Sequence, residues 1–183
     1  MNLLVGVSVL VAVLPLSAQV PSAAPGFTLI NQNGDTIRLN QFRGRLVLLN
    51  FIYTHCVDIC PITTAKLAQI QTELKKRGWF GTKVVLLSVT FDPRRDTPGI
   101  LKEYAKKFKV DHTGWHFLSG EPNTVLRAVR AYKIPFRPAS RPGLIDHALP
   151  TLVIDRRGRI LGHYEPDFDP QDVLRDLAHL LGS

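Results

Sequence analysis

Residues 46–61 read LVLLNFIYTHCVDICP and join a long apolar run to a closely spaced pair of cysteines. The run at 46–53 is almost uninterrupted, which is typical of a β-strand covered on both faces. Pro61 suits the first turn of a helix, where its missing N–H costs no hydrogen bond. The stretch therefore predicts a central strand, a short loop and a helix, with Cys56 and Cys60 at the junction.

The residues that follow repeat this alternation of strand and helix. Residues 61–77 place apolar side chains on one stripe of a helix that ends at Gly78. Residues 84–90 form a second apolar run, which predicts another strand at the centre of a sheet. Two further helices are expected to begin at Pro98 and Pro122, each with proline in its first turn.

Hairpins are expected at both ends of this central part. Residues 27–30 and 36–39 flank Asn-Gln-Asn-Gly-Asp, a turn signal with glycine available for positive φ. Residues 151–154 and 159–164 flank a second turn, and a helix over about 170–181 follows. Together the segments predict an α/β fold with a mixed central sheet, helices on both faces and an N-terminal β-hairpin.

Composition limits the class of protein. The chain has 183 residues, of which 45% are hydrophobic and 21% are charged, so disordered and fibrous classes are excluded. The net charge of +8 suits an anionic partner, but the basic residues are dispersed and no nucleic-acid reader motif accompanies them. Two cysteines cannot form a multi-bridge disulfide scaffold. One globular domain over 25–183 is the simplest organisation.

The N-terminal segment indicates export. No charged side chain precedes Asp35, and residues 3–16 form an apolar run followed by small residues at 22–24. Residues 1–24 are expected to be a signal peptide or an N-terminal membrane anchor, and both alternatives stay open. No cysteine ends the run, so a lipid-modified cysteine anchor is not available. The domain is expected in the periplasm or an equivalent extracytoplasmic compartment, soluble after cleavage or anchored.

The two cysteines carry the chemistry of the junction. Unpaired amides at a helix N-terminus favour a thiolate there. A regular helix would hold the two Cβ atoms about 5–6 Å apart, whereas a disulfide needs about 3.5–4.5 Å. A looped turn could close that gap, and a metal ion could bridge sulfurs that lie further apart. A static disulfide, a redox-active pair and a metal site are therefore all compatible with the spacing.

Three motifs resemble the Sco/SenC family of thioredoxin-like copper proteins, which are linked to assembly of the dinuclear copper centre of cytochrome c oxidase. Residues 53–61, YTHCVDICP, match the cysteine motif, and residues 92–98, DPRRDTP, match a second motif after the next core strand. The later pair Asp146-His147 places His147 at the third ligand position of the family. The resemblance implies a thioredoxin-like fold and one copper ion bound by Cys56, Cys60 and His147.

Further expectations accompany this resemblance. Two thiolates and one imidazole are soft donors that suit Cu(I) and can also serve Cu(II), whereas zinc more often takes a fourth ligand. The resemblance implies the copper-binding subunit of the oxidase as partner, and another copper chaperone or a thiol reductase as further partners. The segment between Lys133 and Ile145 contains three prolines, a glycine and basic residues, so a flexible, positively charged flap is expected there, next to His147.

A second function stays open because Leu149-Pro150-Thr151 resembles the cis-proline turn that faces the cysteines of thioredoxins. Pro150 is then expected to form a cis bond with Leu149. In a thiol–disulfide oxidoreductase, Cys56 would attack a disulfide, Cys60 would resolve the mixed intermediate, and Pro150 would guide the substrate backbone. The substrate would be the oxidase subunit or another exported protein.

The other polar candidates have simpler interpretations. His55 adjoins Cys56 and either stabilises its thiolate or lines the groove. His112 and His116 are four residues apart, but an intervening glycine disfavours a helix that would present both to a metal. Asp92 and Asp96 either support the copper loop or form the turn before the next helix.

Overall fold

The computed structural model describes residues 22–134, 136–138, 145–147 and 149–182. The strands are β1 (Ser22–Ala23), β2 (Thr28–Asn31), β3 (Thr36–Arg38), β4 (Leu46–Ile52), β5 (Val84–Thr90), β6 (Trp115–Ser119), β7 (Phe136–Pro138), β8 (Ile145–His147), β9 (Thr151–Ile154) and β10 (Arg159–Tyr164). The helices are the 3₁₀ turn η1 (Leu39–Phe42), α1 (Ile59–Lys76), α2 (Pro98–Lys107), α3 (Pro122–Ala131) and α4 (Pro170–Leu181). The predicted strands and helices outside the 133–145 segment are present at nearly the expected bounds.

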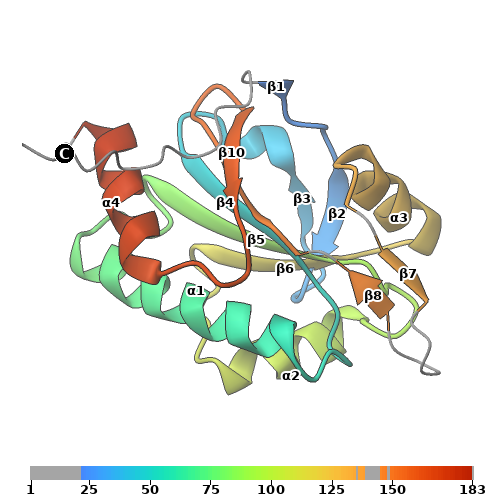
Figure 1. The fold of residues 1–183 in the computed structure, drawn as a ribbon. Helices are drawn as coiled ribbons and strands as arrows, with labels where there is room; N and C mark the ends of the chain where they lie inside the picture. Colours follow the sequence, from blue (N-terminus) through green and yellow to red (C-terminus); the bar gives the residue numbers. More distant parts are fainter. Residues whose placement is uncertain (1–21, 135, 139–144, 148, 183) are drawn as a thin grey trace, which may run out of the picture.

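Eight strands form one mixed sheet in the order β1-β10-β9-β4-β5-β6-β2-β3 (Figure 1). The strands β4, β5 and β6 are parallel, while the outer pairs are antiparallel. Every residue of β4 and β5 is buried, as the uninterrupted apolar runs predicted. The hairpin β2–β3 is the expected N-terminal hairpin, and the predicted mixed α/β sheet is confirmed.

Helices cover both faces of the sheet. On one face, Tyr104 of α2 packs on Phe117 of β6, with ring centroids 6.0 Å apart, and its hydroxyl reaches Thr64 of α1. The helix α4 packs beside α1 on the same face (Figure 1). On the other face, Tyr132 at the end of α3 packs on Phe51 of β4 at 5.7 Å. The β4 residues Asn50 and Phe51 are neighbours in an extended strand, so they point to these opposite faces.

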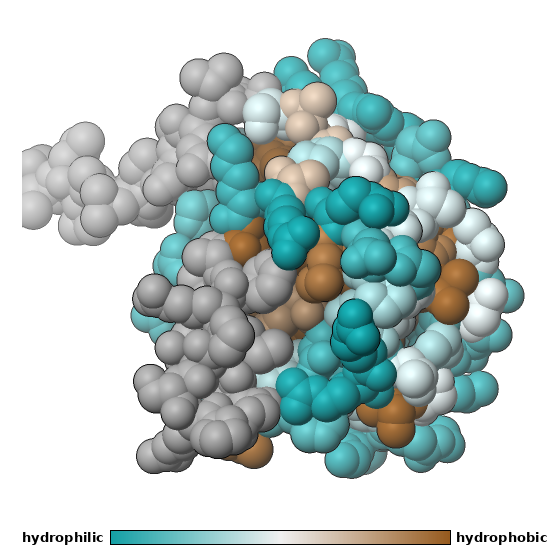
Figure 2. Space-filling model, turned by 90° about the vertical axis from the view of Figure 1, so that its right-hand side faces the viewer, coloured by the Kyte–Doolittle hydropathy of each residue, from teal (hydrophilic) through white to brown (hydrophobic). Residues whose placement is uncertain are grey.

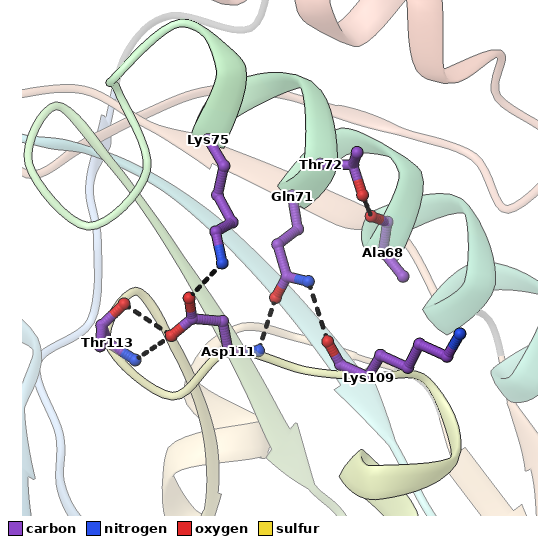
Figure 3. Close-up of polar contacts among 7 residues, drawn as sticks. All are labelled: Ala68, Gln71, Thr72, Lys75, Lys109, Asp111 and Thr113. Carbon is purple, nitrogen blue, oxygen red and sulfur yellow. Dashed lines mark hydrogen bonds and ion pairs between the residues drawn. The ribbon is translucent and has the colours of Figure 1, made fainter.

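Polar contacts fasten α1 to the loop between α2 and β6 (Figure 3). The side-chain amide of Gln71 donates to the Lys109 carbonyl at 3.1 Å and accepts from the Asp111 amide at 2.8 Å. One turn further along α1, Lys75 forms an ion pair of 2.6 Å with the Asp111 carboxylate, which also accepts from Thr113. These contacts fix the second half of α1 to this loop, while Cys60 lies in the first turn at the other end of the helix.

Part of the segment between Lys133 and Ile145, where a flexible, positively charged flap is expected, forms a strand. It contains β7, which pairs with β8 as a separate two-stranded antiparallel sheet, with Phe136 opposite His147. Pairing satisfies the backbone donors and acceptors of both segments, and proline is tolerated in such an edge strand. The expectation for Pro135, Pro142 and Gly143 lies outside the described residues.

The N-terminal boundary also differs in detail. Ser22 and Ala23, which the sequence placed in the N-terminal segment, pair with Ile160 and Arg159 of β10. Residues 1–21 lie outside the described residues. In the ranges that the structure describes, no helix has the length and apolar character needed to cross a membrane.

Candidate metal centre

The two cysteines lie where β4 ends and α1 begins. The helix starts at Ile59, two residues earlier than expected, so Cys60 belongs to its first turn and Cys56 to the preceding loop. The two cysteines form no disulfide, and Cys56 is 7% exposed while Cys60 is fully buried. The backbone amide of Cys60 donates to the Cys56 sulfur at 3.3 Å. An amide in the first turn of a helix favours negative charge on the sulfur that accepts from it.

Cys60 is held as a thiol by its surroundings. Its hydrogen bond with the Cys56 sulfur, its burial and the negative charge of Cys56 all raise the pKa of the Cys60 thiol far above its ordinary value. The Cys60 proton is thereby held between two soft sulfur donors. Such a pair fits a soft, thiophilic cation that displaces the shared proton.

A buried carboxylate fixes the loop before Cys56. Asp96 is fully buried on the loop after β5, and Thr54 donates to it twice, from its hydroxyl at 2.5 Å and its amide at 3.1 Å. Thr90 donates to the same carboxylate at 2.6 Å. Burial raises the pKa of Asp96, although the hydrogen bonds from Thr54 and Thr90 oppose this shift. The carboxylate therefore joins the ends of β4 and β5 behind the cysteine loop.

A second polar contact supports the first turn of α1. The hydroxyl of Thr64 donates to the Cys60 carbonyl at 2.8 Å and shares a 3.0 Å hydrogen bond with the hydroxyl of Tyr104. Tyr104 is 7% exposed, and burial raises its pKa well above the ordinary value. Because Tyr104 belongs to α2, this chain of hydroxyl groups connects the backbone of Cys60 to a neighbouring helix.

Apolar side chains are exposed around the cysteines. Val57, between the two cysteines in sequence, is 85% exposed, and Ile62 in the following turn of α1 is 48% exposed. Ile100 in the first turn of α2 is 46% exposed. Apolar surface also emerges among hydrophilic side chains on the side where α3, β7 and β8 lie (Figure 2).

The other predicted site residues are His147 and Pro150. His147 lies in β8, and its side chain lies outside the described residues. The bond between Leu149 and Pro150 is trans, because no peptide bond among the described residues is cis. The expected cis-proline is therefore wrong; the chain enters β9 at Thr151 with the trans geometry that X–Pro bonds ordinarily prefer. Where the structure describes side chains, no three His, Cys, Asp or Glu residues are grouped to hold a metal.

The other histidines named as candidates contact neighbouring residues. His55 is exposed and lies 3.4 Å from the Thr54 hydroxyl, and His112 lies 3.3 Å from the Trp115 carbonyl. Burial lowers the pKa of His116, whose ring packs near Phe42 at 5.8 Å.

Asp92 forms an ion pair with Arg95 in the turn before α2. The roles of Thr64 and Tyr104 were missed, because no sequence motif marks their contact across α1 and α2.

The chain is similar to known proteins in both sequence and fold. A family model described as SCO1/SenC matches residues 17–182. An SCO2-like protein of Rickettsia prowazekii is 30% identical over 192 residues, covering 95% of this chain and 91% of that protein. The structure of Bradyrhizobium japonicum ScoI with copper bound has a TM-score of 0.75 and 26% identity, covering 87% of this chain and 99% of the other.

A second solved structure, the apo Sco1 protein of Thermus thermophilus, has a TM-score of 0.72 and 31% identity. It covers 91% of this chain and 95% of its own. These similarities extend over nearly the whole described domain and confirm the predicted thioredoxin-like α/β fold.

Proposed function

Because this chain belongs to the SCO1/SenC family, we propose that it binds one copper ion through Cys56, Cys60 and His147 and delivers it to the dinuclear copper centre of cytochrome c oxidase. The observation that carries the proposal is the buried pair of cysteines, which form no disulfide, with the Cys60 amide donating to the Cys56 sulfur. The copper-bound state of the similar Bradyrhizobium japonicum protein supports copper as the metal.

The chemistry of the donors selects the metal. Sulfur donors favour Cu(I), and an imidazole completes a low-coordinate site that can also serve Cu(II). His147 follows Cys60 in sequence by 87 positions (147 − 60), so the fold has to bring its imidazole to the sulfurs. Its strand β8 belongs to the small sheet that is separate from the eight-stranded one. Copper is the cargo of this site, and a three-donor site leaves room for an incoming ligand from the recipient.

The compartment and partners follow from the same proposal. The uncharged, apolar N-terminal segment supports an extracytoplasmic, periplasmic location, either soluble after cleavage or anchored. The recipient is the copper-binding subunit of the oxidase. Another copper chaperone supplies the metal, or a thiol reductase keeps the cysteines reduced, because oxidation would remove both sulfur donors. The exposed Val57 and Ile62 beside the cysteines provide apolar contact for such proteins.

Thiol–disulfide exchange is the second candidate, favoured by two cysteines that form no disulfide and lie in the loop before α1 and in its first turn. In that reaction Cys56 and Cys60 form a disulfide and lose two electrons and two protons, which reduce a disulfide of the oxidase subunit or another exported protein to two thiols. The trans bond before Pro150 removes the cis-proline argument for this activity.

Copper titration of the reduced and disulfide forms tests the proposed function. The reduced chain should bind close to one copper ion per chain, and the disulfide form should bind none at the same site. The substitution H147A should lower copper affinity by at least about tenfold, the scale expected when the support of a metal site is removed. His163, which pairs with Glu165 at 3.1 Å, gives the matched control H163A, which should retain full affinity. Equal copper uptake by the oxidised and reduced forms would contradict the proposal.

A further inference from the structure

Six basic side chains gather at the end of the sheet opposite the cysteines. This surface, called the basic end below, surrounds the start of β4, where Arg45 precedes Leu46, while the cysteines follow the end of the same strand. The parallel strand β5 starts beside it, and α1 runs from the cysteines back to this end. The basic end comprises Arg43, Arg45, Arg77, Lys83, Arg156 and Arg157.

Backbone contacts make the basic end one continuous surface. The Gly44 amide donates to the Arg156 carbonyl at 2.8 Å, which joins the loop before β4 to the β9–β10 turn. The Leu46 amide donates to the Lys83 carbonyl at 2.9 Å, which joins the same loop to the one before β5. The Arg156 guanidinium also donates to the Leu180 carbonyl at 3.0 Å, so the last turn of α4 closes the surface.

The charge of the basic end is not neutralised within the domain. The nearby carboxylates already have other partners: Asp155 pairs with Arg159 at 2.8 Å, and Glu73 pairs with Lys76 at 2.7 Å. None of the six cations of the basic end forms an ion pair with a described residue. The basic end therefore presents a net positive surface that suits an anionic partner.

The basic end also has features of a bilayer interface. Trp79 is half-buried, with the Arg77 guanidinium 5.2 Å and the Lys83 ammonium 5.7 Å from its ring centroid. Tryptophan beside basic side chains is typical of the headgroup region, where an amphipathic ring and cations both find partners. A hollow of about 460 Å³ lies at this end and is lined by three leucines, three arginines and one aspartate: Leu46, Leu161, Leu180, Arg156, Arg157, Arg159 and Asp155.

The N-terminal part of the described chain enters at this same end. Ala23 of β1 pairs with Arg159, and the Ala24 amide donates to the Gly158 carbonyl at 3.0 Å. The apolar run at residues 3–16 precedes this point in the sequence. We propose that the basic end docks on the anionic phospholipid headgroups of a bilayer and holds the cysteine end of the domain toward the aqueous compartment. Basic residues beside an apolar segment gain affinity for such a surface through its negative potential.

Energy transfer from Trp79 to a dansyl-labelled lipid headgroup tests the proposal. The full chain is reconstituted into vesicles of phosphatidylcholine alone or with phosphatidylglycerol, and the Trp79 signal is obtained by subtracting the W79F variant. Transfer should be higher in the anionic vesicles and should fall as salt is added, because salt screens the headgroup charge. Equal transfer in the two kinds of vesicle, or a lack of salt dependence, would overturn the proposal.

Charge variants locate the contact. Neutralisation by R156Q/R157Q should reduce the ratio of docked to undocked domains by roughly 25-fold, at about fivefold for each cation near an anionic surface. The matched control R94Q/K102Q neutralises two exposed cations near the cysteine end and should leave transfer unchanged. Copper loading of R156Q/R157Q reports that the variant is folded. Unchanged transfer in R156Q/R157Q, or equal loss in the control, would overturn docking by the basic end, and the surface would then suit an acidic protein instead.

Discussion

The Asp96 carboxylate accepts two hydrogen bonds from Thr54, the residue two positions before Cys56. The Thr54 hydroxyl lies 2.5 Å from one carboxylate oxygen and the Thr54 amide 3.1 Å from the other. The two residues are 42 positions apart in sequence and meet because β4 and β5 are parallel neighbours that end together. The position of the cysteine loop thus depends on a buried carboxylate that belongs to another loop.

Removal of this carboxylate should destabilise the domain and weaken copper binding. In D96A the Thr54 amide and the Thr90 hydroxyl lose their buried acceptor, so the free energy of unfolding should fall by about 2–4 kcal/mol. Chemical unfolding and a copper-chelator competition measure the two effects.

The isosteric variant D96N is the control for this prediction. It keeps one oxygen for the Thr54 amide and Thr90, and the Thr54 hydroxyl can rotate to accept from the new amide. It should therefore retain most of the stability and copper affinity. If D96A and D96N lost the same copper affinity, hydrogen bonding by Asp96 would not be what positions the loop.

The contact between α1 and α2 should show energetic coupling. Y104F leaves Thr64 hydrogen-bonded to the Cys60 carbonyl and should lower the free energy of unfolding by about 0.5–1.5 kcal/mol. T64V leaves the buried Tyr104 hydroxyl without its partner and should cost more, about 1–3 kcal/mol. In the double variant the loss should be smaller than the sum of the single losses by at least about 0.5 kcal/mol. Strict additivity in urea unfolding would show that the two hydroxyl groups do not interact.

The ion pair between Lys75 and Asp111 should give a pH-dependent stability. Hydrogen bonding from Lys75, and then from Thr113, lowers the pKa of Asp111 to about 2. A carboxyl whose pKa is depressed by folding stabilises the native state above its unfolded pKa, and this contribution is lost as the pH falls through the folded value. The free energy of unfolding of the wild type should therefore exceed that of D111N by roughly 1 kcal/mol at neutral pH. This difference should disappear between about pH 4 and pH 2.

Thermal unfolding across this pH range measures the gap. The matched control is E103Q, because Glu103 pairs with Lys106 at 2.6 Å where both side chains are well exposed. At neutral pH the free energy of unfolding of E103Q should lie within about 0.5 kcal/mol of the wild-type value. A D111N gap that stayed constant down to pH 2 would exclude the carboxylate charge as its cause.

Two glycines should respond oppositely to alanine. A Cβ on Gly114 would lie 2.7 Å from the Gly81 backbone nitrogen, so G114A should force two loops apart and cost about 1–3 kcal/mol. At Gly99, in the first turn of α2, an added methyl group would meet no atom within 4 Å, so G99A should be neutral or stabilise by up to about 1 kcal/mol. Melting temperatures of the two variants compare them directly, and equal shifts would contradict the close approach at Gly114.

Local patterns in the sequence predicted most of the fold. The apolar runs of β4 and β5 required strands covered on both faces, and prolines marked the starts of α2 and α3. The pairing of β7 with β8 was missed, because prolines and glycine in that segment indicate loop while strand pairing depends on a partner elsewhere in the chain. The trans geometry at Pro150 was missed because a three-residue likeness does not determine a peptide-bond isomer.

Within the candidate site, the sequence predicted the cysteines and His147, and it left support of the cysteine loop by Asp96 as one of two alternatives. Cys56 and Cys60 are close in sequence, and their place before a helix follows from the strand that precedes them. The role of Asp96 depends on the register between β4 and β5, and that of Tyr104 on how α2 packs against α1. Such contacts between distant residues have no local signature. The predicted role of His147 remains to be measured.

X-ray absorption at the copper edge tests the proposed ligand set most directly. The reduced full chain loaded with one equivalent of Cu(I) should show two sulfur scatterers and one imidazole nitrogen around copper. The imidazole scattering should disappear in H147A and persist in H163A. A spectrum with fewer than two sulfur scatterers, or imidazole scattering that is unchanged in H147A, would contradict binding by Cys56, Cys60 and His147.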